Sequence, residues 1–263
     1  CQRDAFAGGT RHNPAMKDLS NLTGLVPDGA RIFDRRLLAR RRDRAAATAE
    51  AHDFLFAEAA ERLLDRLDDV THRFPTALDI GCRDGLIARR LRGRGGIRHL
   101  IQGDLSGAML ARARKHGSVV RLDEEMLPFA GESLDLVLAN LCLHWVNDLP
   151  GALAQIRHAL KPDGLFLAVI FGGGTLAELQ ECLMDAEIAE TGGASPRVSP
   201  FADLRDAAGL LQRAGFALPV ADAETLTVTY PDILRLMADL RGMGETNPLL
   251  DRLKRPTRRA VRA

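Results

Sequence analysis

The sequence predicts an α/β fold built on a doubly wound, mostly parallel sheet with helices on both faces. Two observations lead to this fold class. After Pro75, short apolar runs of the length of buried strands recur along the chain. Amphipathic segments with helical period separate these runs. Repeated strand–helix units place the strands side by side and parallel, so that helices cover both faces of the sheet.

Each expected element follows from a local signal. The apolar runs predict strands at residues 77–80, 99–102, 119–122, 134–139 and 165–171. The intervening patterns predict helices at residues 85–91, 106–115 and 150–160. Ser106 is a residue type that caps helices, and Gly117 lies just past the end of the same helix. Pro150 fits the first turn of the third helix.

A helical pattern also precedes the sheet, over residues 31–67, with Asp34 as its candidate cap. Seven arginines lie between Arg31 and Arg44. They could bind an acidic partner or lipid head groups, or they could form a solvated helix face that Asp34 and Asp43 partly neutralise. We favour the solvated face.

The chain beyond residue 172 is expected to be mainly helical. Thr175 and Glu178 have the spacing of a capping box, for a helix that reaches about residue 190. Further helices are expected at residues 203–214 and 231–247, and the segment at 226–230 predicts a sixth strand.

Composition argues against several classes of protein. The net charge of +1, with one Trp and one Tyr, gives no reason to expect nucleic acid as a partner. No apolar run approaches the ~18 residues of a membrane helix, and no secretory signal is visible, so we expect a cytoplasmic protein without a transmembrane segment. The four cysteines form no CxxC pair, and no HExxH motif is present, so no metal site is expected.

The stretch "TALDIGCRDGLIARRL", at residues 76–91, has the outline of a strand–turn–helix nucleotide cradle. Gly81 and Gly85 allow a tight turn that brings backbone amides close to a ligand. Arg83 stands between them, where a third glycine would be most useful. If Arg83 takes a positive φ, it is strained by roughly 1–3 kcal/mol, which weakens ligand binding rather than abolishing it.

Two acidic residues follow the second and third expected strands. Asp104 comes 23 residues after Gly81, close to the spacing at which a carboxylate receives ribose hydroxyls. It could also serve as the partner of the helix dipole that begins at Ser106. Asp123 could accept a hydrogen bond from an adenine amino group, and Glu124 and Glu125 compete for that role.

The fourth expected strand is followed by Asn140 and then by "LHW", which contains His144. Because ligands of doubly wound sheets bind beyond the carboxyl ends of the strands, both residues are candidates for the reaction chamber. His144 could act as a base or orient a substrate. It could equally be a structural histidine that a backbone carbonyl satisfies beneath Trp145.

Taken together, these motifs resemble a class I S-adenosylmethionine-dependent methyltransferase; they are "LDIGCRDG", "GDLSGAML", "LDEEMLPF", "LDLVLANLCLHWVNDLPGAL" and "LKPDGLFLAVIFGG". Three further stretches resemble the bacterial relatives of the mitochondrial complex I assembly factor that has a methyltransferase-like fold; they are "IFDRRLLARRRDRAA", "GGASPRVSPFADLRDAAGLLQRAGFALPVAD" and "DLRGMGETN". The malonyl-carrier-protein methyltransferase of biotin synthesis is a more distant relative.

The resemblance implies a Rossmann-like fold and S-adenosylmethionine as cofactor. It implies methyl transfer to a protein or small-acid acceptor, or alternatively arginine hydroxylation or non-catalytic assembly of respiratory complex I, with a complex I subunit as partner. It assigns Asp79, Gly81 and Gly85 to the methionine-binding turn. Asp104 would hold the ribose, and Asp123 would lie near adenine. Asn140 would face the transferred methyl group, and with His144 it forms the candidate catalytic pair.

Four regions follow from this comparison. We expect an unstructured extension at residues 1–30, a helical cap at 31–75 and an S-adenosylmethionine-binding core at 76–172. Residues 173–263 would hold a helical insertion, the sixth strand and a truncated C-terminal part. Such families finish with a seventh, antiparallel strand, so the fold is expected to stop before its last strand.

Overall fold

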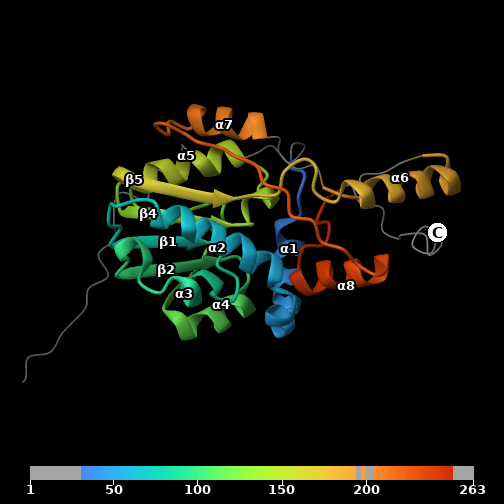
Figure 1. Cartoon of the computed structure of the whole chain (residues 1–263), viewed down its shortest axis with the longest axis horizontal. Coiled ribbons are helices and arrows are strands. Elements are labelled where there is room, and N and C mark those ends of the chain that lie inside the picture. The colour runs from blue at the N-terminus through green and yellow to red at the C-terminus, as the bar shows by residue number, and fades with distance from the viewer. Residues whose placement is uncertain (1–30, 194–196, 200–203, 251–263) are drawn as a thin grey trace, which may run out of the picture.

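The computed structural model describes residues 31–193, 197–199 and 204–250 of the 263-residue chain. The extension expected at residues 1–30 and the basic segment at 251–263 lie outside the described residues, so the structure does not test these two expectations. Within the described part, helices surround a central sheet (Figure 1).

The sheet has five strands, all parallel, in the order β3-β2-β1-β4-β5. Their bounds are β1 Thr76–Ile80, β2 His99–Asp104, β3 Ser118–Arg121, β4 Leu134–Asn140 and β5 Leu160–Val169. The predicted α/β, doubly wound class is therefore confirmed, and all five expected strands of this sheet are present. The strand order reverses between β1 and β4, and the carboxyl ends of strands at such a reversal are where ligands of open sheets bind.

Helices pack against both faces, because alternate residues of the central strands point to opposite sides. On one face, Leu136 and Leu138 of β4 pack with α2 (Phe54–Asp68) and α3 (Leu86–Arg90). On the other face, Val137 and Ala139 pack with α5 (Leu149–Ala159) and α7 (Leu204–Arg213). The helix α4 (Gly107–Ala113) contacts β2 and β3. These layers form the hydrophobic core that holds the strand ends in place.

Local signals placed several helix starts correctly. Asp34 caps α1 (Arg35–Ala45), since its carboxylate accepts a hydrogen bond from the Leu37 N–H. Ser106 caps α4 in the same way. The helical pattern expected over residues 31–67 corresponds to α1 and α2, which a 3-10 segment, η4 (Ala46–His52), separates.

The C-terminal region differs from expectation in two places. The helix α6 (Ala177–Thr191) begins after Leu176, which has a φ of +60°, so the capping box expected at Thr175 is wrong. The segment at residues 226–230 is not a strand in the structure. A strand requires a hydrogen-bonded neighbour, and the described sheet provides none for this segment, which is the physical reason why the predicted sixth strand is absent there.

Two helices of the C-terminal region differ in how they are placed. The helix α8 (Ile233–Met243) packs beside α1, whereas α6 lies apart from the sheet (Figure 1). An antiparallel bridge between Phe33 and Leu249 joins the segment before α1 to the segment after α8. None of the helices that the structure describes is long and apolar enough to cross a membrane.

Candidate functional site

The candidate site lies at the carboxyl ends of β1, β2 and β4, as predicted. Gly81 directly follows β1, Asp104 is the last residue of β2, and Asn140 is the last residue of β4. These three strands are neighbours in the sheet, so the three residues lie close together at one edge.

The turn after β1 is tight and depends on glycine. Gly81 has a φ of +65°, and a Cβ added there would lie 2.3 Å from the Cβ of Cys142. Gly85 has a φ of +87° at the start of α3. Between them, Arg83 has a φ of +53°, a region that a residue with a side chain rarely adopts. The strain expected for a positive φ at Arg83 is therefore present, at roughly 1–3 kcal/mol.

Asp79 lies beneath this turn and is an unusual buried acid. Its side chain is fully buried, and neither carboxylate oxygen has a hydrogen-bond partner among the described residues. Burial, with a further contribution from the neighbouring Asp104, raises the pKa of Asp79 well above its ordinary value. A buried carboxylate without a partner is costly, so this position is suited to a cationic group of a ligand.

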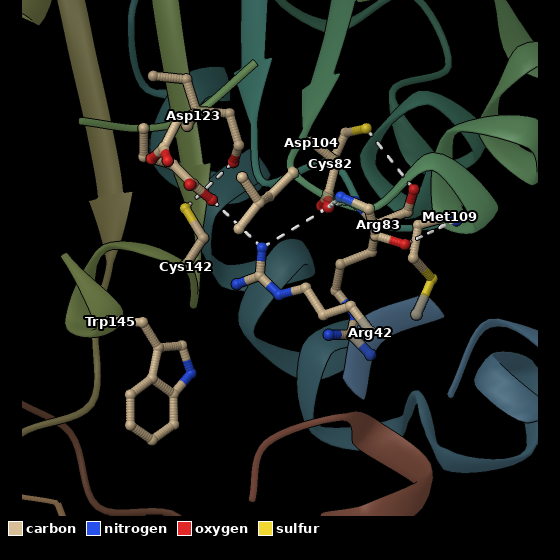
Figure 2. Close-up of polar contacts among 12 residues, drawn as sticks. Arg42, Cys82, Arg83, Asp104, Met109, Asp123, Cys142 and Trp145 are labelled. Atoms are coloured by element: carbon tan, nitrogen blue, oxygen red, sulfur yellow. Dashed lines mark hydrogen bonds and ion pairs between the residues drawn. The ribbon is translucent and has the colours of Figure 1, made fainter. Parts of the chain in front are cut away.

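Asp104 holds the turn and is itself held by an arginine. One of its oxygens accepts the backbone N–H of Arg83 at 3.0 Å, and the other accepts that of Ser106 at 2.7 Å. The guanidinium of Arg42 reaches Asp104 from α1 at 3.7 Å (Figure 2). It also contacts Glu124 at 3.2 Å. Burial raises the pKa of Asp104, and Arg42 opposes that rise.

We expected the arginines of this helix to form a solvated face, but Arg42 is only 1% exposed. The expectation is therefore wrong for the side of α1 that faces the site. Arg35 is also turned inward and forms ion pairs with Asp123, Glu124 and Glu125. Burial alone would lower the pKa of Arg42, but Asp104 and Glu124 raise it above its usual value. Two arginines of α1 thus neutralise the acids that the sequence assigned to a ligand.

Among the acids after β3, Glu124 is the most enclosed. Its side chain is fully buried, whereas the side chain of Asp123 is 30% exposed and lies at the rim of the site. Burial opposes ionisation of Glu124, but Arg35 and Arg42 lower its pKa below the usual value. Glu124 is therefore held by both arginines, whereas Asp123 is paired with Arg35 at the rim of the site.

Asn140, which ends β4, and the residues that follow it are tied to distant segments. The Asn140 side-chain amide donates to the backbone carbonyl of Phe56 at 2.9 Å. His144 lies in η7 (Leu143–Trp145), and its Nε2 is 3.1 Å from Glu245. For a structural histidine at this position we expected a backbone carbonyl as the partner, whereas this partner is a carboxylate. Burial lowers the pKa of His144, and Glu245 opposes that change. Trp145 also donates its indole N–H to Glu245.

A cavity of about 790 Å³ adjoins these residues. Its apolar wall includes Leu55, Trp145, Phe171, Leu240 and Met243, and Glu245 also lines it. Four arginines line the same cavity, namely Arg41, Arg44, Arg197 and Arg241. The cavity can therefore accept a molecule with an apolar part and an anionic part.

The chain matches the model of the methyltransferase domain family over residues 78–168. The arginine-hydroxylase NDUFAF5 of Danio rerio mitochondria is 42% identical over 225 residues, which cover 83% of this chain and 70% of that protein. The malonyl-[acyl-carrier protein] O-methyltransferase of Xylella fastidiosa is 35% identical, over 84% of this chain and 75% of that protein. The chain belongs to this methyltransferase family. Its cofactor is S-adenosylmethionine, and the family resemblance noted in the sequence is confirmed.

Solved structures support the same fold. A methyltransferase of Thermotoga maritima, described as a possible histamine N-methyltransferase, matches with a TM-score of 0.52 at 21% identity, over 68% of this chain and 81% of that one. A phosphoethanolamine N-methyltransferase of Haemonchus contortus matches with a TM-score of 0.53 at 22% identity, over 68% of this chain and 44% of that one. At these identities the likeness shows the fold alone.

The residues of the site fit this cofactor. The Asp79 carboxylate, which has no hydrogen-bond partner among the described residues, suits the cationic methionine end. Gly81 is required because Cys142 occupies the space that a side chain there would need, and this keeps the turn tight. Sequence reasoning missed the inward roles of Arg42 and Glu245. Among the described residues, no group of three His, Cys, Asp or Glu is placed to hold a metal ion.

Proposed function

We propose that this protein transfers the methyl group of S-adenosylmethionine to a protein or small-acid acceptor that enters the arginine-lined cavity. Binding of the cofactor is supported by one observation: the buried carboxyl group of Asp79, beneath the glycine turn, has no hydrogen-bond partner among the described residues. A cation that binds next to such a carboxyl group stabilises its ionised form.

In this proposal each site residue has a defined role. Asp79, Gly81 and Gly85 form the turn that holds the methionine part of the cofactor. Asp104 receives the ribose hydroxyls, and Asp123, with Glu124 deeper in the site, lies near adenine. The cofactor supplies a methyl group that is already activated by the attached sulfonium. The chain then contributes binding, alignment and exclusion of water.

Cofactor binding at Asp104 requires a local change. The Arg42 guanidinium contacts this carboxylate, whose side chain is fully buried. A ribose that bonds to Asp104 must therefore displace Arg42. Because Arg42 is a long and flexible side chain, it can turn away without unfolding α1.

The cavity favours an anionic acceptor. Four arginines line it, and a cationic acceptor would be repelled by them. A carboxylate acceptor needs no base, because it is already ionised at neutral pH. Where the acceptor carries a proton, His144 is the candidate base. Its lowered pKa keeps the imidazole neutral near pH 7. Asn140, the last residue of β4, would face the methyl group.

Calorimetric titration with S-adenosylhomocysteine tests the cofactor half. We expect binding to the whole chain and loss of binding in Asp104→Asn. The matched control is Asp135→Asn, which removes a carboxylate at the opposite end of the sheet, where it pairs with Lys161. Equal binding by wild type and Asp104→Asn would contradict the assignment of the ribose site.

A second candidate is arginine hydroxylation, which rests on the relatives named arginine-hydroxylases. It would insert an oxygen atom from dioxygen with a two-electron reductant, both supplied from outside the chain. Its acceptor, an arginine of a complex I subunit, would have to enter despite the four arginines that line the cavity. Mass spectrometry of a reacted acceptor separates the two functions, since one adds a methylene and the other an oxygen.

The third candidate is a non-catalytic assembly factor of complex I in the cytoplasm. Its contact surface would be the outer face of α1, where Arg36 and Arg40 are exposed at one-turn spacing and lie outside the cavity lining. Changing both to alanine would then abolish capture of the partner subunit while cofactor binding stayed intact. Unchanged capture would exclude this surface.

A further inference from the structure

One buried carboxylate, Glu245, connects the cofactor turn with the acceptor cavity. It follows Gly244, whose φ of +77° ends α8 and turns the chain back toward the sheet. The Glu245 side chain is 4% exposed. One of its oxygens pairs with Arg83 at 3.3 Å, and the other contacts His144 at 3.1 Å and accepts the indole N–H of Trp145.

These partners come from the ends of two neighbouring strands. Arg83 belongs to the turn after β1, and His144 and Trp145 belong to the segment after β4. Glu245 also lines the cavity. A single side chain thus contacts the binding turn, the candidate base and the acceptor space.

The contact with Arg83 has a consequence for the turn. Arg83 keeps a positive φ only while its surroundings enforce it. Its guanidinium is fixed by Glu245, by the Met243 carbonyl at 2.6 Å and by the face of Phe56 at 3.8 Å. In this conformation the Arg83 backbone N–H donates to Asp104. Arg83 therefore links Glu245 with Asp104, the carboxylate that we propose binds the ribose.

Glu245 is not placed to exchange protons with a substrate. Both of its oxygens are directed at protein donors, and His144 together with the nearby arginines outweighs burial and lowers the pKa of Glu245 to about 2. A carboxylate this acidic remains ionised at neutral pH and is a weak base.

We propose that Glu245 is a positioning residue, which holds Arg83 clear of the cofactor and fixes the orientation of His144. It thereby aligns the cofactor turn with the acceptor cavity. The inference rests on the proposed function, and it gives a role to a residue that lies just beyond the end of α8.

A double-mutant cycle tests the step through Arg83. S-adenosylhomocysteine affinity is measured by calorimetry for wild type, Glu245→Gln, Arg83→Gly and the double variant. We expect Glu245→Gln to weaken binding about tenfold in the wild-type background, since coupled neighbours interact at this scale. In the Arg83→Gly background the same change should alter binding less than about twofold, because glycine adopts a positive φ unaided.

Equal losses in both backgrounds, or no loss in either, would overturn the proposal. The matched control is Glu187→Gln, which removes another buried carboxylate paired with an arginine, Arg197 at 2.8 Å. Glu187→Gln should leave S-adenosylhomocysteine affinity unchanged. A tenfold loss of affinity in this control would show that the double-mutant cycle measures loss of fold stability and not the contact with Arg83, which would overturn the proposal. If Glu245→Gln does not fold, Glu245→Asp takes its place, since it keeps the charge but withdraws it from Arg83.

A second readout needs no ligand. The His144 ring is titrated by NMR, with its signal assigned by its absence in His144→Gln. Because Glu245 raises the pKa of His144, Glu245→Gln should lower it further. An unchanged pKa would overturn the proposed contact. If wild type binds no S-adenosylhomocysteine, the proposed function fails, and the NMR titration alone still decides whether Glu245 orients His144.

Discussion

Replacing Arg42 by methionine would leave Asp104 and Glu124 buried without the cation that lies between them. The guanidinium is 3.7 Å from one carboxylate and 3.2 Å from the other. At an effective dielectric constant of ~20, each contact contributes about 5 kcal/mol of Coulomb energy before desolvation is subtracted. Removing one partner of such a buried pair has a net cost of about 3–5 kcal/mol, which is the loss of unfolding free energy that we expect.

The pH dependence of that loss follows from the acid left behind. Burial already raises the pKa of Asp104, and without the opposing effect of Arg42 it rises further. A carboxyl group with a raised folded-state pKa favours the folded state below its unfolded pKa and loses this contribution as the pH rises. The difference between variant and wild type should therefore be larger near pH 8 than near pH 5.

Urea unfolding at these two pH values measures the stability, with Arg36→Met as the matched control on the exposed side of α1. The control should change stability by less than about 0.5 kcal/mol. Arg42→Met should also tighten S-adenosylhomocysteine binding, because no guanidinium then has to be displaced from Asp104. An Arg42 variant as stable as the control would refute the buried ion pair, and weaker binding would show that Arg42 contacts the cofactor.

Three further outcomes can be measured by denaturant unfolding. Gly81→Ala should cost more than about 2 kcal/mol, because its Cβ would clash with Cys142, whereas Gly93→Ala, with a φ of +84° and no atom within 4 Å, should cost only about 1 kcal/mol. Equal costs would contradict the tight turn. The pKa of about 2 at Glu245 is below the unfolded value, so its stabilisation is present above about pH 4.5 and is lost as the pH falls toward 2. Wild type should lose roughly 3 kcal/mol over that range that Glu245→Gln does not lose, and parallel pH profiles would contradict the shift. Asp34→Ala should cost about 1 kcal/mol through loss of the α1 cap, and an unchanged urea midpoint would contradict the capping hydrogen bond.

The sheet was predictable because its signals are local. The apolar run of β4 and the glycines that follow β1 are read directly from neighbouring residues, and both were placed correctly. The segment at 226–230 has the same kind of pattern but no strand beside it in the described sheet. Pairing is a property of the folded chain, so residue pattern alone could not distinguish the two.

The inner face of α1 shows a signal that was available but overlooked. Arg35, Leu38, Arg42 and Ala45 follow one another at spacings of three and four residues, so all four share one face of the helix. Three of them are buried, and the fourth is mostly so. The apolar members indicated a packed face, but the acids that receive the arginines lie on other elements, which the helix sequence could not reveal.

Glu245 gave no comparable signal. It occurs in a motif that supported the family resemblance, but its partners lie 100 or more residues away along the chain. Contacts between residues so far apart in the chain become visible only in the folded structure, where the end of α8 lies next to the strand ends.

The bridge between Phe33 and Leu249 also sets an order of events during synthesis. A ribosome that adds ~5–20 residues per second needs roughly 4–16 s to travel from the end of β5 to Leu249. During that interval all five strands have been made, but the segment that pairs with the start of α1 has not. The segment after α8 is the last described part of the chain to leave the ribosome. Its pairing with the segment before α1 is therefore the last of these contacts to form. For most of this interval the nascent chain holds Arg83 and His144 without Glu245, the carboxylate that contacts both.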